Sequence, residues 1–186
     1  KKVVERTNEI NSQKQELHVI AENLEDKHRY LINGLNYAKT IQEAILPSEK
    51  KILETFPNHF IIFKPKDVVS GDFYWFTKFE NKIFLAVVDC TGHGVPGAFM
   101  SIVGSSLLNK IIKELKITDP VAIFDRLNIE VIETLKQGEG QGKNTDGMDV
   151  CLCLLEETET GTKLTYGGAK RPLFVYQNEE LIEVKG

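Results

Sequence analysis

The sequence has few cysteines, no excess of either charge and no long apolar run. Its three cysteines, Cys90, Cys151 and Cys153, lack the spacing of a metal cluster or a disulfide framework, so we expect free, buried thiols and a reducing, cytoplasmic setting. Lys and Arg number 23 against 27 Asp and Glu, without a basic block, which argues against nucleic acid as a partner. No apolar stretch approaches the roughly 18 to 20 residues that span a bilayer, so we expect no direct membrane insertion.

The composition is that of an ordinary globular protein. The chain has 186 residues, of which 41% are hydrophobic and 27% charged, enough for one sizeable core. This balance argues against a disordered or fibrous protein. Because the sequence opens on lysine and not on methionine, we expect an internal segment of a longer protein.

The N-terminal quarter has a helical pattern. Residues 1–46 contain no proline and a single glycine, and apolar residues recur in them at seven-residue spacing. These positions are Val3, Ile10, Leu17, Leu24, Leu31, Ala38 and Ile45. The spacing predicts a long helix, which we interpret as a helical linker over residues 1–46. The positions three residues further on are mostly polar, so any coiled coil would be weak. Two interpretations stay open: a parallel homodimer formed through this helix, and a helix that lies against its own domain.

Residues 58–186 have the pattern of a separate α+β domain. Short β-type runs predict strands at 60–63, 72–79, 83–89, 148–155, 163–166, 173–176 and 181–184. A broad apolar helix is expected from Gly97 to about Lys113, and a second helix after the capping pair Asp119-Pro120. A glycine-rich polar loop covers residues 138–147. Strands on both sides of a helix pair indicate antiparallel sheet and not alternating βαβ units.

The segment Gly92-His93-Gly94-Val95-Pro96-Gly97 matches the G-x-G-x-x-G pattern of dinucleotide-binding proteins. That fold requires the following helix to lead into a second parallel strand ending in an acidic residue. Here the helix leads into Asp119-Pro120 and another helix, so we do not favour nucleotide binding.

Two carboxylates are expected at one end of the sheet. Asp89 closes the apolar strand 83–89, and Asp72 begins the strand before it. A hairpin with its turn at Glu80-Asn81 would bring the two together and supply the hard oxygen ligands that Mg²⁺ or Mn²⁺ prefers. Taken singly, each aspartate favours a structural interpretation, Asp72 as a turn former and Asp89 as a strand-end cap.

Several segments together resemble the SpoIIE-like bacterial serine phosphatases, a branch of the metal-dependent type 2C protein phosphatases. The matching segments are residues 63–75 (FKPKDVVSGDFYW), 87–98 (VVDCTGHGVPGA) and 146–149 (DGMD). Residues 37–47 (YAKTIQEAILP) are similar to the helical lead-in of this class. The resemblance therefore runs through most of the chain.

The resemblance implies a fold, a reaction and partners. The fold would be an antiparallel β-sandwich flanked by helices, preceded by the long N-terminal helix. Asp72, Asp89 and the carbonyl of Cys90 would hold metal, with Asp89 bridging two Mn²⁺ or Mg²⁺ ions in the complete domain. Such ions activate a water that attacks a phosphoserine or phosphothreonine. The implied substrate is a phosphorylated regulatory protein, such as an anti-sigma-factor antagonist, and the implied upstream neighbour is a sensor domain.

For the other residues of these motifs we consider two possible roles each. Cys90 has no adjacent base, so we expect a passive thiol and a role for its backbone alone. His93 either protonates the leaving serine oxygen or only shapes its turn. Lys64 and Lys66 either contact substrate phosphate or are solvated surface charges. Asp146 and Asp149 either reach a further metal or fix the 138–147 loop, and for Asp149 we favour the structural role.

The sequence departs from the family in one respect. It ends before the two later acidic motifs that normally supply the remaining carboxylates, so we expect a C-terminally incomplete phosphatase domain that is inactive by itself. The alternative function is a noncatalytic dimerisation and partner-binding signalling module.

Overall fold

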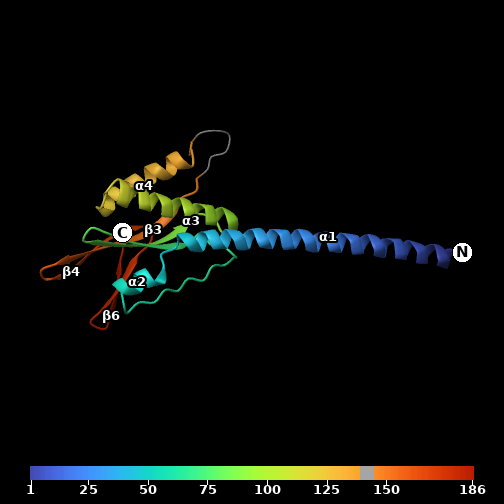
Figure 1. Cartoon of the computed structure of the whole chain (residues 1–186), viewed down its shortest axis with the longest axis horizontal. Coiled ribbons are helices and arrows are strands. Elements are labelled where there is room, and N and C mark those ends of the chain that lie inside the picture. The colour runs from blue at the N-terminus through green and yellow to red at the C-terminus, as the bar shows by residue number, and fades with distance from the viewer. Residues whose placement is uncertain (139–144) are drawn as a thin grey trace. The chain divides into compact units, whose positions relative to one another are not determined.

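The computed structural model describes residues 1–138 and 145–186 (Figure 1). The chain divides into two compact units, Lys1–Ala38 and Lys39–Gly186. Helix α1 (Lys2–Ile45) makes up nearly all of the first unit, and its last residues, from Lys39 to Ile45, belong to the second unit. This confirms the helix that the seven-residue spacing predicts, and its apolar side chains are exposed, with Leu17 and Leu24 each 66% accessible.

The described strands of the second unit form two antiparallel sheets. The larger has the order β1 (Phe73–Phe79), β2 (Lys82–Cys90), β3 (Met148–Thr158) and β4 (Gly161–Ala169). The smaller is the hairpin of β5 (Leu173–Gln177) and β6 (Glu180–Val184). The predicted turns at Glu80-Asn81 and Asn178-Glu179 join neighbouring strands, and Glu80, Asn178 and Glu179 have the positive φ angles of tight turns. The antiparallel α+β class is therefore confirmed.

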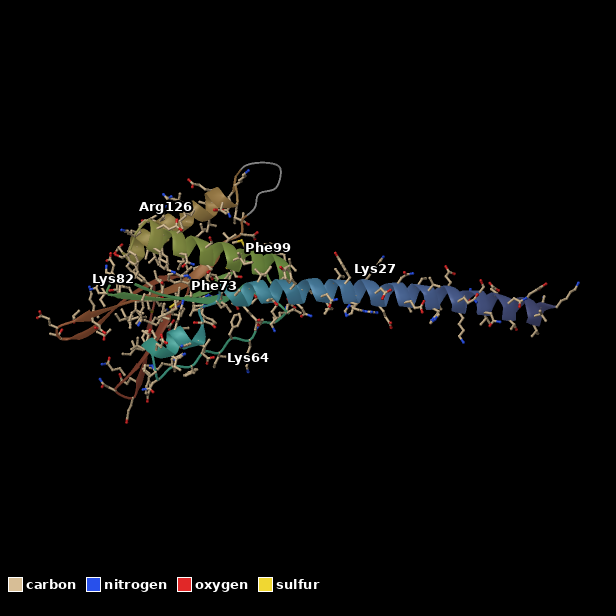
Figure 2. All side chains as sticks on the ribbon, in the orientation of Figure 1. Lys27, Lys64, Phe73, Lys82, Phe99 and Arg126 are labelled. Atoms are coloured by element: carbon tan, nitrogen blue, oxygen red, sulfur yellow. The ribbon has the colours of Figure 1, made fainter. Side chains whose placement is uncertain are left out.

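Two helices cover one face of the larger sheet (Figure 1). Helix α3 (Gly94–Asn109) continues into a π-helical turn, η1 (Lys110–Glu114), and α4 (Pro120–Thr134) follows. The Asp119 side chain accepts a hydrogen bond from the Ala122 amide at 3.0 Å, so the predicted cap is present. Buried Glu130 of α4 accepts hydrogen bonds from Lys110 at 2.7 Å and from Arg126, which is labelled in Figure 2. Because Lys110 belongs to η1, its bond joins η1 to α4.

The core lies between these helices and alternate residues of β1, β2 and β3. The Phe73 ring, labelled in Figure 2, packs against Gly104 of α3, where an added Cβ would lie 3.0 Å from its tip. The fully buried core side chains include Phe84, Leu108, Ile111, Ile112, Ile123 and Leu152. Gly94–Glu114 is long and apolar enough to cross a membrane by length and composition alone. However, 56% of an apolar 18-residue stretch within this segment is buried in the domain, as in the core helix of a folded domain.

One local prediction is wrong, and one short helix was not predicted. The expected strand at 60–63 is an extended segment that pairs with no strand in the described part of the chain, and Phe60 is 85% exposed. A strand exists only where a neighbour accepts its hydrogen bonds, which local composition cannot reveal. The short helix α2 (Glu49–Thr55), which buries Ile52, lies between Pro47 and Pro57 and was not predicted. Its seven residues are too few to display a helical period.

Candidate functional site

The β1–β2 hairpin brings Asp72 and Asp89 together. Phe73 pairs with Val88, so the two aspartates flank the last pair at one end of the sheet. The pKa of the Asp72 carboxyl is raised, first by partial removal from water, and then by its hydrogen bond with Asp89 and repulsion from that carboxylate. A nearby positive charge, Arg171, acts in the opposite direction. The structure thus shows the pairing of carboxylates that the sequence predicts.

Three glycines allow this end of the sheet to pack closely. A Cβ on Gly71 would lie 2.6 Å from the Gly92 carbonyl oxygen, and a Cβ on Gly97 would lie 2.6 Å from the same atom. Gly92 also has a φ of 90°, which L-residues rarely adopt. The start of β1, the loop after β2 and the first turn of α3 are therefore in backbone contact. This contact explains why glycines occupy these positions in both motifs.

Buried Gln42, near the end of α1, fixes the turn that carries Asp72. Its amide nitrogen donates to the Ser70 carbonyl at 2.6 Å and to the Ser101 hydroxyl oxygen at 2.7 Å. Its amide oxygen accepts from the Ser70 amide at 3.0 Å. The Ser70 hydroxyl oxygen in turn accepts from the Asp72 amide at 3.0 Å. Gln42 belongs to the lead-in motif, but its burial has no local sequence signal.

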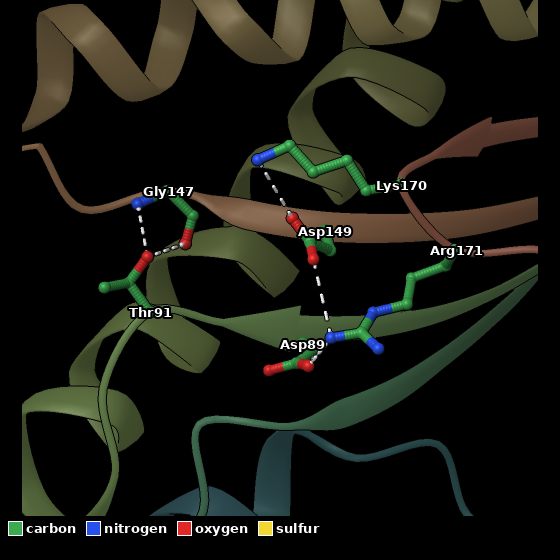
Figure 3. Close-up of polar contacts among 6 residues, drawn as sticks. All are labelled: Asp89, Thr91, Gly147, Asp149, Lys170 and Arg171. Carbon is green, nitrogen blue, oxygen red and sulfur yellow. Dashed lines mark hydrogen bonds and ion pairs between the residues drawn. The ribbon is translucent and has the colours of Figure 1, made fainter.

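A second set of charged residues completes the site. The β2–β3 register places Asp149 directly opposite Asp89, and Arg171 contacts both carboxylates, with 3.4 Å from its Nη2 to Oδ2 of Asp149 (Figure 3). Lys170 Nζ lies 3.8 Å from Oδ1 of Asp149. Sequence reasoning gave Asp149 a structural role at a strand start and missed Lys170 and Arg171, because nothing local connects them with Asp89.

The neighbouring loop is tied to β3. The Thr91 amide donates to the Gly147 carbonyl at 2.9 Å. The Thr91 hydroxyl donates to the same carbonyl at 3.2 Å and accepts from the Gly147 amide at 3.0 Å (Figure 3). The Asp146 carbonyl accepts from the Gln137 amide group at 2.6 Å. Residues 139–144 of the expected glycine-rich loop lie outside the described residues.

His93 is exposed at the N-cap of α3, and its Nδ1 is hydrogen-bonded to Oδ2 of Asp67 at 2.9 Å. This bond joins two loops beside the aspartate pair and supports the turn-shaping role, while proton donation by His93 stays a prediction. Lys64 and Lys66 are both exposed. Lys64 lines an open, largely apolar cavity of about 1150 Å³ that also reaches Asp72 and Asp89.

Cys90 is buried, with 4% of its surface accessible. Burial, followed by the charges of Asp89 and Asp72, raises the pKa of its thiol to about 12. The thiol is therefore protonated at neutral pH and is a poor nucleophile. Its carbonyl oxygen lies near the turn at Gly71, 3.2 Å from the position of an added Cβ. The expectation that only the Cys90 backbone has a role agrees with this environment.

The donors fit a divalent cation only in part. Among the described residues, no group of three or more His, Cys, Asp or Glu side chains is placed to hold a metal ion. However, Asp72 and Asp89 are hard oxygen donors whose mutual repulsion a cation would relieve, and Mg²⁺ commonly binds through one or two carboxylates and several waters. The site therefore suits one hydrated Mg²⁺ or Mn²⁺ better than two enclosed ions.

Comparison with known proteins identifies the family. The model of the family described as Stage II sporulation protein E (SpoIIE) matches residues 80–185, and the chain belongs to this family. A solved structure, the SiaA-PP2C domain of Pseudomonas aeruginosa, is similar with a TM-score of 0.71 and 32% sequence identity. The match covers 86% of this chain and 61% of that one. No curated protein matches the chain significantly. The resemblance to SpoIIE-like, type 2C serine phosphatases and the expected fold class are thus confirmed.

Proposed function

We propose that this chain is part of a metal-dependent phosphatase that acts on phosphoserine or phosphothreonine of a regulatory protein, such as an anti-sigma-factor antagonist. The observation that carries the proposal is the convergence of Asp72 and Asp89 at one sheet end, within a chain of the SpoIIE family. The similarity to a PP2C domain supports the same reaction class.

In this proposal Asp72, Asp89 and the Cys90 carbonyl hold Mn²⁺ or Mg²⁺, with two ions in the complete domain. Bound cations of this kind activate water and neutralise phosphate oxygens. The chain's own residues position the carboxylates and do not supply a nucleophile. The close glycine contact fixes the distance between the two aspartates, and because the Cys90 thiol is protonated, the attacking group is water. Lys64 is exposed in the cavity that reaches both aspartates, and in this proposal its positive charge attracts a phosphorylated protein segment.

The test compares Asp89→Asn with Cys90→Ala in the full-length protein, using a phosphoserine protein substrate with Mn²⁺ or with a chelator. We expect Asp89→Asn and Asp72→Asn to lose nearly all turnover, and Cys90→Ala to keep most of it. A Cys90→Ala enzyme as inactive as Asp89→Asn would refute metal-dependent hydrolysis in favour of thiol catalysis.

A noncatalytic signalling module is the second candidate. It is favoured by the partial donor set in the described residues and by the contact of Arg171 with Asp89. Full-length protein that binds a phosphorylated partner but shows no Mn²⁺-dependent turnover would support this candidate over the enzyme.

For regulation, we propose homodimerisation through residues 1–38, whose apolar stripe is exposed. Such a helix would transmit a signal from an upstream sensor domain in the cytoplasm. Support comes from Gln42, because the end of the same helix is hydrogen-bonded to the turn before Asp72.

A further inference from the structure

The acidic end of the sheet already has a cation from the chain itself. Asp89 and Asp149 face each other on adjacent strands, an arrangement of like charges that destabilises a sheet unless a positive group intervenes. Arg171 supplies that group, because its guanidinium contacts one carboxylate oxygen of each aspartate (Figure 3).

We propose that Arg171 occupies the cation position beside Asp89 in the metal-free chain, so that a divalent cation has to displace it and Arg171 lowers the metal affinity of the site. This inference rests on the proposed function, since it assumes that Asp89 is a metal ligand. Asp89 Oδ2, the atom that Arg171 contacts, cannot bind the guanidinium and a metal ion at full strength together.

The backbone around Arg171 is fixed while its side chain is accessible. The Tyr166 hydroxyl donates to the Arg171 carbonyl, and Lys170, with a φ of 60°, forms a β-bridge with Val150. The Arg171 side chain is 45% exposed, so its guanidinium is able to leave Asp89 for solvent without disturbing these contacts. The displacement therefore requires a side-chain rotation and no change of fold.

The expected effect is moderate because both partners are partly exposed. Exposed ion pairs are individually weak, but a guanidinium bridging two carboxylates is stronger than one pair, and its charge also repels an incoming dication. We therefore expect Arg171→Gln to tighten Mn²⁺ binding by about threefold to tenfold. Lys170 is 85% exposed and lies 3.8 Å from Oδ1 of Asp149, the oxygen that Arg171 does not contact, so Lys170→Gln should change the affinity little and serves as the matched control.

The experiment is calorimetric titration of the chain with Mn²⁺ at neutral pH and low salt, on wild type, Arg171→Gln, Arg171→Lys, Lys170→Gln and Asp89→Asn. Tighter binding by Arg171→Gln than by Lys170→Gln, with the site lost in Asp89→Asn, supports the proposal. Circular dichroism shows whether Arg171→Gln is folded, and Arg171→Lys, which keeps the charge without the bridging geometry, should lie between wild type and Arg171→Gln.

Two results overturn the inference in different ways. Binding that Asp89→Asn abolishes but that Arg171→Gln leaves unchanged or weakens means that Arg171 only braces the sheet end, and the proposed metal site survives. Absence of Mn²⁺ binding in every variant refutes the metal site in this chain and the inference with it. As a second measurement, the NMR signal of the Arg171 Nε–H should shift with the diamagnetic Mg²⁺ and saturate at the Mg²⁺ affinity that a parallel calorimetric titration gives, and an unmoved signal argues against displacement.

Discussion

Replacing Gly71 by alanine should separate the two aspartates of the candidate site. The added methyl group would lie 2.6 Å from the Gly92 carbonyl oxygen, 3.2 Å from the Cys90 carbonyl oxygen and 3.4 Å from the Gly97 Cα. All three are backbone atoms, so no side-chain rotation relieves the contact. The start of β1 and the loop after β2 have to move apart, and Asp72 and Asp89 move with them.

The cost follows from the packing of this region. Overpacking typically destabilises by about 1–3 kcal/mol, and contacts this short with backbone place Gly71→Ala in the upper half of that range. Removing a glycine also restricts the unfolded chain, which offsets about 0.4–1 kcal/mol. We therefore expect a net loss of about 1–2.5 kcal/mol in the free energy of unfolding. Mn²⁺ binding should weaken in addition, because the carboxylates no longer converge.

Gly147→Ala is the matched control, since Gly147 belongs to the same end of the sheet through its hydrogen bonds with Thr91. No heavy atom lies within 4 Å of its Cβ position, and its φ is not positive. Its stability should be unchanged or raised by up to about 1 kcal/mol. Urea unfolding and Mn²⁺ titration of both variants decide the matter. If Gly71→Ala matches the control in stability and wild type in Mn²⁺ affinity, the close backbone contact does not set the site's geometry.

Three further predictions concern the rest of the chain. Gln42→Ala leaves buried polar groups unpaired and should cost about 1–3 kcal/mol in urea unfolding, whereas Gln15→Ala, on the exposed part of α1, should be neutral. A loss no larger than that of the control would show that water replaces the amide. Hydrogen bonds from a lysine and then an arginine hold the pKa of Glu130 below its ordinary value of 4.5, so Glu130→Gln should lower the melting temperature at neutral pH. That difference should shrink as the pH falls through and below 4.5, because wild-type Glu130 then loses its charge, and a constant difference would contradict this account. Finally, Leu17→Asp with Leu24→Asp should convert a dimer to a monomer in light scattering, and an unchanged mass in a dimeric protein would exclude this stripe as the interface.

The parts of the fold that depend on near neighbours were predictable. The β1–β2 hairpin follows from alternating apolar residues on both sides of Glu80-Asn81, and the start of α4 from Asp119-Pro120, since each is stabilised by contacts within a few positions. The pairing of Asp72 with Asp89 is a consequence of that hairpin. Helix α1 likewise follows from its uninterrupted composition.

The sequence by itself determined the family, the α+β class and the two aspartates, because motifs, periodicity and hairpin turns are all read from adjacent residues. Only the tertiary structure decided which distant groups join them. Arg171 reaches Asp89 across 82 positions. Asp149 faces Asp89 through the pairing of β2 with β3, two strands that α3 and α4 separate in the chain. The segment 60–63 shows the converse, since extended propensity without a paired neighbour gives no strand. The physical reason is that strands pair, and charges are neutralised, between groups that are close in the folded protein but far apart in the sequence.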